Sequence, residues 1–164
     1  MKIGTERLVL QSISPELARR IVRGEHASSD RWHAEYPFED ELDPLRSFIA
    51  GPAPDSFLTM YLIRRKSDGL AVGGFGFRGR PHTTGRVEFG YGLVPAAREV
   101  GLATEAVRAA LEVAITHGAR TAAADTEVSN GASQRVVQKA GLVETHRQGG
   151  FVFFNASFFD SSKP

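Results

Sequence analysis

Hydrophobic and polar residues alternate along several stretches of the chain, a spacing that is typical of β-strands with one buried face. In the first such stretch, residues 5–13, Leu8 and Leu10 fall on the same face. Three later stretches are separated by short turns and predict an antiparallel meander. The strands predicted in this way are residues 5–13, 57–64, 70–78, 86–94 and 121–128, with at least one more in the apolar and aromatic tail, residues 151–159.

Apolar residues spaced three and four apart predict about four helices. The expected helices are residues 14–22, 44–49, 102–117 and 132–140. Ser14 and Pro15 are residues that favour a helix start. The second helix is expected to begin at Pro44. Between the first two helices, residues 25–43 show no clear periodicity.

The order of these elements predicts one α+β domain with a mixed sheet, in which a single helix crosses over after the meander. The 164 residues suit one domain, taken here as residues 1–164, with enough chain for a proper core. An apolar content of 41% and a charged content of 24% are those of an ordinary globular protein.

Composition excludes several classes of function. A net charge of +1 gives no basis for nucleic-acid binding. The chain has no cysteine, which excludes disulfides, thiolate metal sites and a cysteine nucleophile, and its five histidines show no metal-ligand spacing. The N-terminus lacks an apolar signal core and no stretch is long enough to cross a membrane, so we expect a cytoplasmic protein without a metal or a membrane partner.

The strongest chemical signal is the sequence Arg98-x-x-Gly101-x-Ala103, between a predicted strand and the third helix. A helix start carries unpaired N–H groups and the positive end of a dipole, and therefore attracts anions. Gly101 lets the backbone approach an anion closely, and Arg98 adds a cationic fork. An ordinary strand-to-helix loop is the simpler interpretation, but the context favours a site for the diphosphate of a nucleotide-like cofactor.

Two further features carry polar groups in unusual places. Asn130 and Ser133 stand at the start of the fourth helix, where helix capping explains part of the pattern. Glu88 lies in the middle of a predicted strand, on the face opposite Val87 and Phe89. A solvent-facing position and a position facing substrate are equally compatible with this pattern for Glu88. The glycine-rich residues 74–79 match a dinucleotide fingerprint only formally, because no helix follows them.

Taken together, residues 98–103, 130–142 and the opening residues 5–10 resemble the GNAT superfamily of N-acetyltransferases, in particular the ribosomal-protein N-terminal acetyltransferases. The resemblance implies a three-layer α/β/α fold with a central mixed, mostly antiparallel sheet of about six to seven strands and about four helices. Two residues depart from the family pattern. Leu142 stands where phenylalanine is usual, and Val100 stands where a basic or small residue is common.

The resemblance also implies an activity, namely direct transfer of the acetyl group of acetyl-CoA to a primary amine in a ternary complex. The amine would belong to a protein N-terminus or to a small molecule. Glu88 would be the general base, directly or through water, and Ser133 or Tyr91 would give a proton to the departing thiolate. Backbone N–H groups of residues 90–94 would stabilise the oxyanion if the strand splays there.

Coenzyme A would be held mainly by backbone groups. The N–H groups of residues 101–104, together with Arg98, would bind the diphosphate, the strand edge at residues 93–95 would pair with the pantetheine amides, and Asn130 would reach the pantetheine or the carbonyl. The cofactor-binding residues expected from the resemblance are Leu93, Val94, Arg98, Val100, Gly101, Leu102, Ala103, Thr104, Asn130 and Ser133.

Several alternatives remain open from the sequence. The same fold could serve as a non-catalytic acyl-CoA-binding or sensing module. The acidic and aromatic residues 32–43 are either a solvated helix and loop or the lip of a pocket for a cationic amine. The aromatic tail belongs either to the core or to an edge that pairs with a second copy in a homodimer.

Overall fold

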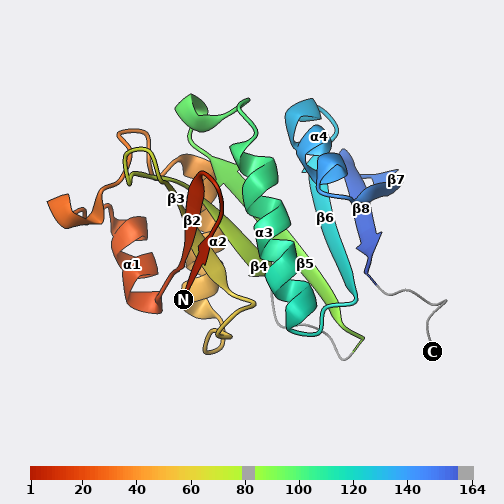
Figure 1. The fold of residues 1–164 in the computed structure, drawn as a ribbon, viewed down its shortest axis with the longest axis horizontal. Coiled ribbons are helices and arrows are strands. Elements are labelled where there is room, and N and C mark those ends of the chain that lie inside the picture. The colour runs from red at the N-terminus through yellow and green to blue at the C-terminus, as the bar shows by residue number, and fades with distance from the viewer. Residues whose placement is uncertain (79–83, 159–164) are drawn as a thin grey trace.

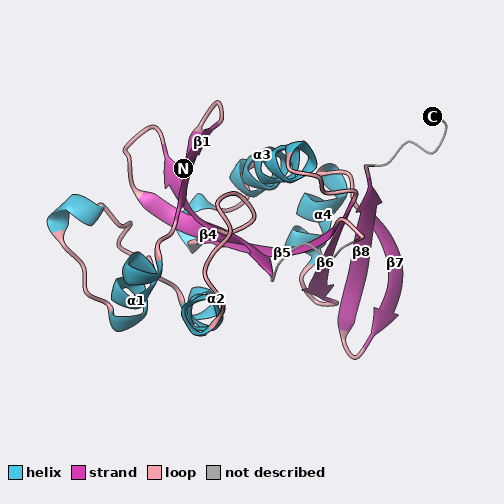
Figure 2. Ribbon diagram, turned by 90° about the horizontal axis from the view of Figure 1, so that it is seen from below, coloured by secondary structure: helices cyan, strands magenta, loops and turns pink. Residues whose placement is uncertain are grey.

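The computed structural model describes residues 1–78 and 84–158 and has three layers, with helices on both faces of a twisted sheet (Figures 1 and 2). The strands are β1 (Lys2–Gly4), β2 (Leu8–Ser12), β3 (Met60–Arg65), β4 (Ala71–Arg78), β5 (Arg86–Leu93), β6 (Thr121–Glu127), β7 (Val143–Gln148) and β8 (Phe151–Ser157). The helices are α1 (Pro15–Arg23), α2 (Glu39–Ala50), α3 (Leu102–Thr116) and α4 (Gly131–Lys139), with short 3₁₀ turns at Ser28–Asp30 and Pro95–Ala97. Figure 2 shows α1 and α2 on one side of the sheet and α3 on the other.

The strands form one mixed sheet in the order β1-β2-β3-β4-β5-β6-β8-β7, in which only β5 and β6 are parallel. This confirms the α+β class and the mostly antiparallel sheet, but the described sheet has eight strands rather than six or seven. Two short or exposed edge strands account for the difference. β1 has three residues, and every residue of β7 is exposed, so neither shows the alternation that predicts a strand.

The two parallel strands separate along their length. Pairing joins residues 86–88 of β5 to residues 121–123 of β6, and Glu88 with Ala123 is the last pair. Beyond it β5 continues to Leu93 and β6 to Glu127, as expected for a sheet that splays there. The crossover helix α3 starts at the open end of this gap, shortly after β5 ends (Figure 1).

Helix α2 begins earlier than the sequence pattern predicts. The prediction placed the start at Pro44, whereas the helix runs over Glu39–Ala50 and contains Pro44. The first turn carries three acidic residues, which the positive end of the helix dipole stabilises. Glu41 and Leu45, one turn apart, are both buried, so packing also favours the longer helix.

On the face of the sheet that α2 covers, one patch of β4 and β5 consists of glycines and therefore has no side chains. Gly74 pairs with Gly92, and Gly76 pairs with Gly90, so four glycines of β4 and β5 share this face. Side chains from elsewhere cover them. A Cβ added at Gly92 would lie 2.7 Å from the ring of Phe38, and one added at Gly74 would lie 1.9 Å from a carboxylate oxygen of Glu41. The glycines of residues 74–78 therefore allow close packing within a strand, and no dinucleotide site is formed there.

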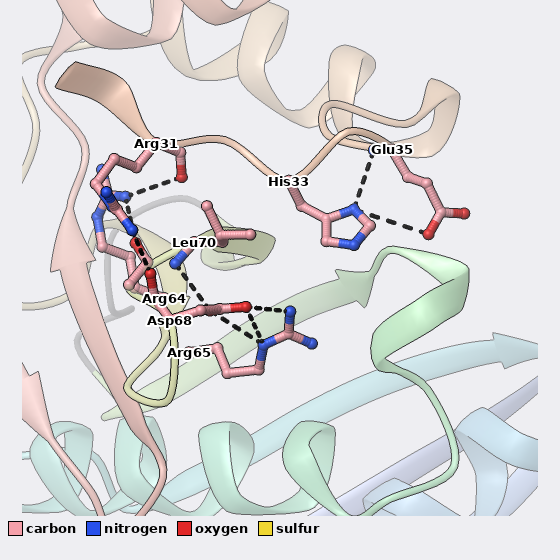
Figure 3. Close-up of polar contacts among 8 residues, drawn as sticks. Arg31, His33, Glu35, Arg64, Arg65, Asp68 and Leu70 are labelled. Carbon is pink, nitrogen blue, oxygen red and sulfur yellow. Dashed lines mark hydrogen bonds and ion pairs between the residues drawn. The ribbon is translucent and has the colours of Figure 1, made fainter. Parts of the chain in front are cut away.

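The segment that leads into α2 is fixed to the turn between β3 and β4 (Figure 3). Arg64 of β3 donates to the carbonyls of Asp30 at 2.9 Å and Gly69 at 3.2 Å, and Arg31 donates to the carbonyl of Asp68 at 2.6 Å. The N–H of Ala71 also donates to the carbonyl of Arg31 at 2.8 Å. These bonds place residues 32–38, and hence the start of α2, along β4.

The remaining helices agree with the sequence pattern. Helix α3 spans Leu102–Thr116, one residue shorter than predicted, and packs a row of small and aliphatic residues against the sheet. Its fully or nearly buried apolar residues are Leu102, Ala106, Val107, Ala110, Leu111 and Ala114. The hydroxyl of Ser14 caps α1 by accepting from the N–H of Leu17 at 3.1 Å.

Candidate active site

A cavity of about 1290 Å³ lies between α2, the glycine patch of β4 and β5, and the starts of α3 and α4. Its volume exceeds that of typical small-molecule pockets, about 300–1,000 Å³, and leaves room for an extended cofactor and an acceptor together. The walls come from segments that are distant in sequence, so the fold itself creates the cavity. Of the residues that the sequence singled out, the lining includes Tyr91, Leu93, Arg98, Gly101, Ala103, Thr104, Asn130 and Ser133.

The start of α3 presents backbone N–H groups to this cavity. Gly101 has a φ of 84°, a left-handed conformation in which glycine is favoured. The first intrahelical bond runs from the N–H of Glu105 to the carbonyl of Gly101 at 3.1 Å, so the N–H groups of residues 102–104 precede the helical ladder. Leu102 contributes its N–H while its side chain lies in the core, at 4% exposure. This is a geometry suited to an anion.

Arg98 and the end of β5 interact directly. The Nε of Arg98 donates to the carbonyl of Leu93 at 2.9 Å, and Arg98 also lines the cavity. The N–H of Val94 donates to the carbonyl of Val72 at 2.8 Å and is therefore committed to the sheet. Since alternate residues of a strand direct their backbone groups to opposite sides, the groups of Leu93 face the gap toward β6.

The opening residues of the chain hold the loop before α3. The hydroxyl of Thr5 donates to Glu105 at 2.6 Å, and the Nε of Arg7 donates to the same carboxylate at 3.0 Å. Arg7 also donates to the carbonyl of Val100 at 2.8 Å. Burial raises the pKa of Glu105, but the hydrogen bonds from Thr5 and Arg7 outweigh it and lower the pKa below its ordinary value. Two separate sequence motifs thus form one clamp, and Val100 takes part through its carbonyl while its side chain is exposed.

Removing this clamp should weaken cofactor binding, although the clamp residues are not expected to contact the cofactor themselves. Since Arg7 fixes the carbonyl of Val100 next to Gly101, we expect Arg7→Ala to loosen the loop and to reduce the affinity for acetyl-CoA. The expected loss is about tenfold, or about 1.4 kcal/mol. Isothermal titration calorimetry measures it, with Arg19→Ala, an exposed arginine of α1, as the control. An unchanged affinity in Arg7→Ala would show that the clamp does not position the loop.

Tyr91 and Ser133 meet across the gap between β5 and α4. The hydroxyl of Tyr91 donates to the carbonyl or the hydroxyl oxygen of Ser133, both at 3.2 Å. Asn130 caps α4 by accepting from the N–H of Ser133 at 3.1 Å, and all three residues line the cavity. Burial raises the pKa of Tyr91, so its phenol keeps its proton at neutral pH and can donate it.

Glu88 lies at the point where β5 and β6 stop pairing, away from these groups. Its side chain is 43% exposed and forms an ion pair with Arg86 at 3.0 Å. Glu88 is not among the described residues that line the cavity. Along an extended strand, Gly92 lies four residues further on, or about 13 Å away. Transfer at Gly92 would be out of direct reach of Glu88, so its role as general base, directly or through water, stays a prediction.

A different carboxylate, Glu41 of α2, lies in the cavity. Its exposure is 5%, and the hydroxyl of Tyr36 is 3.4 Å from its Oε1. Burial raises the pKa of Glu41 to about 7, partly offset by the hydrogen bond from Tyr36. Glu41 was not among the site residues predicted from the sequence, where it stands within the acidic residues 32–43. Its spacing from Phe38, Leu45 and Phe48, which puts all four on one side of a helix, was the available signal.

The family profile described as an acetyltransferase (GNAT) domain matches residues 7–143. The chain belongs to the GNAT acetyltransferase family. No curated protein matches the chain.

Solved structures share the fold. A GNAT-family acetyltransferase from Bacillus anthracis is 18% identical over 96% of this chain and 98% of its own, with a TM-score of 0.67. The ribosomal-protein-S5-alanine acetyltransferase from Vibrio fischeri is 15% identical over 100% of both chains, with a TM-score of 0.65. The ribosomal L7/L12 alpha-N-protein acetyltransferase RimL, solved in complex with coenzyme A, is 16% identical over 96% of this chain and 98% of its own, with a TM-score of 0.66.

As a GNAT member the chain is an acetyl-CoA-dependent N-acetyltransferase. The cavity fits this cofactor, because the bare N–H groups at the start of α3 and the left-handed glycine before them form a place for a diphosphate. Among residues 1–78 and 84–158 no group of three or more histidines and carboxylates could hold a metal ion. None of the described helices is long and apolar enough to span a membrane.

Proposed function

We propose that this GNAT protein transfers the acetyl group of acetyl-CoA directly to a cationic primary amine, with both substrates bound in the one cavity. The observation that carries this proposal is the distribution of charge along the cavity walls. The charged lining residues from α2 are all acidic, namely Asp40, Glu41 and Asp43, and Asp55 adds a further carboxylate. Such a wall attracts an ammonium group.

The opposite side of the cavity carries cations. Arg98 lies beside the bare N–H groups of α3, and Arg135 and Lys139 of α4 also line the cavity, with Glu99 as the acid among them. A polyanionic cofactor on this side and a cationic acceptor on the α2 side would meet over β5. From the acidic and aromatic residues 32–43, the cavity lining includes Phe38, Asp40, Glu41 and Asp43, which supports placing this stretch at the lip of the acceptor pocket.

The chain's own groups have separate roles in this proposal. The N–H groups of residues 101–104 and the guanidinium of Arg98 bind the diphosphate, and the backbone of Leu93 aligns the pantetheine arm. Backbone N–H groups of β5 that face the gap stabilise the negative charge that develops on the carbonyl oxygen. Tyr91, relayed through Ser133, supplies a proton to the departing thiolate, and Asn130 orients the cofactor near α4. The cofactor supplies the activated acetyl thioester.

A coenzyme A release assay tests the proposal. We expect acetyl-CoA to raise the melting temperature, and we expect coenzyme A release with at least one cationic amine among an alanine-first peptide, spermidine and an aminoglycoside. The same peptide with an acetylated N-terminus and no lysine is the control and should give no release. Binding of acetyl-CoA without release by any primary amine would contradict the proposal and would favour an acyl-CoA-binding module.

A further inference from the structure

Glu41 reaches the sheet at a place where the sheet has no side chains. A Cβ added at Gly74 would lie 1.9 Å from the Oε1 of Glu41, so glycine at this position is what allows the carboxylate to rest on β4. Glu41 is at the same time part of the cavity lining. A carboxylate that is 5% exposed and still borders a cavity is a group that a bound ligand would meet.

The carboxylate lies one strand away from the part of β5 to which the proposed function assigns the acetyl group. Gly74 pairs with Gly92 of β5, and neighbouring strands are about 4.8 Å apart. The ring of Phe38 covers Gly92, so Phe38 and Glu41 lie side by side over the two paired glycines. An amine that approaches β5 from the α2 side passes this pair.

The contact with Tyr36 is too weak to explain why a carboxylate is buried at Glu41. Their oxygen atoms are 3.4 Å apart, longer than the 2.5–3.0 Å of a strong O–H···O bond. A buried carboxylate that serves only the fold is normally paired or held by several hydrogen bonds, because an unpaired buried charge is costly. Here the long contact from Tyr36 is the one side-chain hydrogen bond recorded for Glu41 within residues 1–78 and 84–158.

We propose that Glu41 is the general base that removes a proton from the acceptor ammonium, directly or through one water molecule. This inference rests on the proposed function. The freed lone pair of the amine forms a C–N bond to the acetyl carbonyl carbon, and the C–S bond breaks with its electron pair on the thiolate. The second amine proton passes to this thiolate through Tyr91 and Ser133. Protonated Glu41 then releases its proton to solvent, so one proton is produced for each amide formed.

The environment of Glu41 suits this task. Burial raises its pKa to about 7, close to the pH at which a general base is most effective. The preceding segment contributes the phenol of Tyr36, whose pKa burial and Glu41 both raise, while the charge of Arg64 acts on Tyr36. The paired positions of β4 and β5 below Glu41 are glycines. Further along the same face of β4, Arg78 lies over Gly90 and is paired with Asp125.

The test compares Glu41→Gln, Glu88→Gln and Glu39→Gln with the wild type, using the amine that gives coenzyme A release. Glu39 is an exposed residue at the start of the same helix, so Glu39→Gln is the matched control. We expect Glu41→Gln to bind acetyl-CoA as tightly as the wild type and to lose kcat by about 100-fold or more. The wild-type kcat should rise with pH through a pKa near 7, and Glu41→Gln should lack this rise, whereas Glu39→Gln should retain it.

Glu41→Asp provides a second variant, because it keeps the charge but withdraws the carboxylate from Gly74. We expect a lower kcat with the pH dependence still present. Three results would overturn the assignment: an unchanged kcat in Glu41→Gln, a higher KM for the amine with an unchanged kcat, or loss of the pH dependence in Glu88→Gln but not in Glu41→Gln. Failure of the wild type with every amine is a different outcome and overturns the proposed function itself.

Discussion

Gly101→Glu is expected to reduce the affinity for acetyl-CoA by at least about 100-fold, or about 2.7 kcal/mol. The new carboxylate would stand at the start of α3, where the diphosphate is proposed to bind, and like charges in contact repel each other by several kcal/mol. The left-handed φ of 84° also strains any residue other than glycine at this position. Isothermal titration calorimetry with acetyl-CoA measures the loss.

Gly118→Glu separates the effect of charge at the site from the effect of strain. Gly118 lies just after the other end of α3, has a φ of 94° and has no atom within 4 Å of an added Cβ. Gly118→Glu should therefore lose about 1–3 kcal/mol of stability through backbone strain alone and keep its affinity for acetyl-CoA. A Cβ at Gly101 would in addition lie 3.2 Å from the Nη2 of Arg7. Equal affinity losses in the two variants would mean that the loop before α3 has no special part in binding.

Glu41→Gln is expected to stabilise the protein at pH 8 relative to the wild type, although it abolishes most of the activity. The folded-state pKa of Glu41 is raised from 4.5 to about 7. Its contribution to stability is therefore present in full below pH 4.5 and is lost as the pH rises through about 7. At 1.36 kcal/mol per pKa unit the loss is about 3 kcal/mol.

Urea unfolding at pH 4.5 and pH 8 measures this difference between the wild type and Glu41→Gln. The free energy of unfolding of Glu41→Gln should gain about 3 kcal/mol on the wild type between the two pH values. Glu39 is exposed, so Glu39→Gln removes no buried charge and should change the free energy of unfolding little at either pH. A parallel pH dependence for the wild type and Glu41→Gln would show that the carboxylate of Glu41 is not held in an unfavourable environment.

Much of the proposed cofactor-binding part of the site could be predicted from the sequence, because the patterns that indicate it are local. A glycine before a strongly periodic helix predicts a bare helix start wherever the helix packs, and Gly101 does precede α3, with a left-handed φ. The pairing of Tyr91 with Ser133 joins residues 42 positions apart, and the sequence offered them only as separate proton donors. Their contact depends on how far β5 and α4 are separated, which no local pattern contains.

The acceptor side could not be predicted in the same way. Glu41 is one of several acidic residues in a row, and only its helical spacing from Phe38 and Leu45 distinguishes it in sequence from its exposed neighbours Glu39 and Asp40. Its burial follows from the longer helix and from Gly74, which lies 33 positions away and leaves room for the carboxylate. Glu88 drew attention because a charge in the middle of a strand is unusual, yet its ion pair with Arg86 gives it a local partner.

Amide NMR during a titration with acetyl-CoA shows whether the N–H groups at the start of α3 bind the cofactor diphosphate. We predict that the largest changes in ¹H and ¹⁵N shifts fall on residues 101–104, followed by the end of β5, with α1 unaffected. Residues 101–104 that keep their shifts at saturating acetyl-CoA would contradict it.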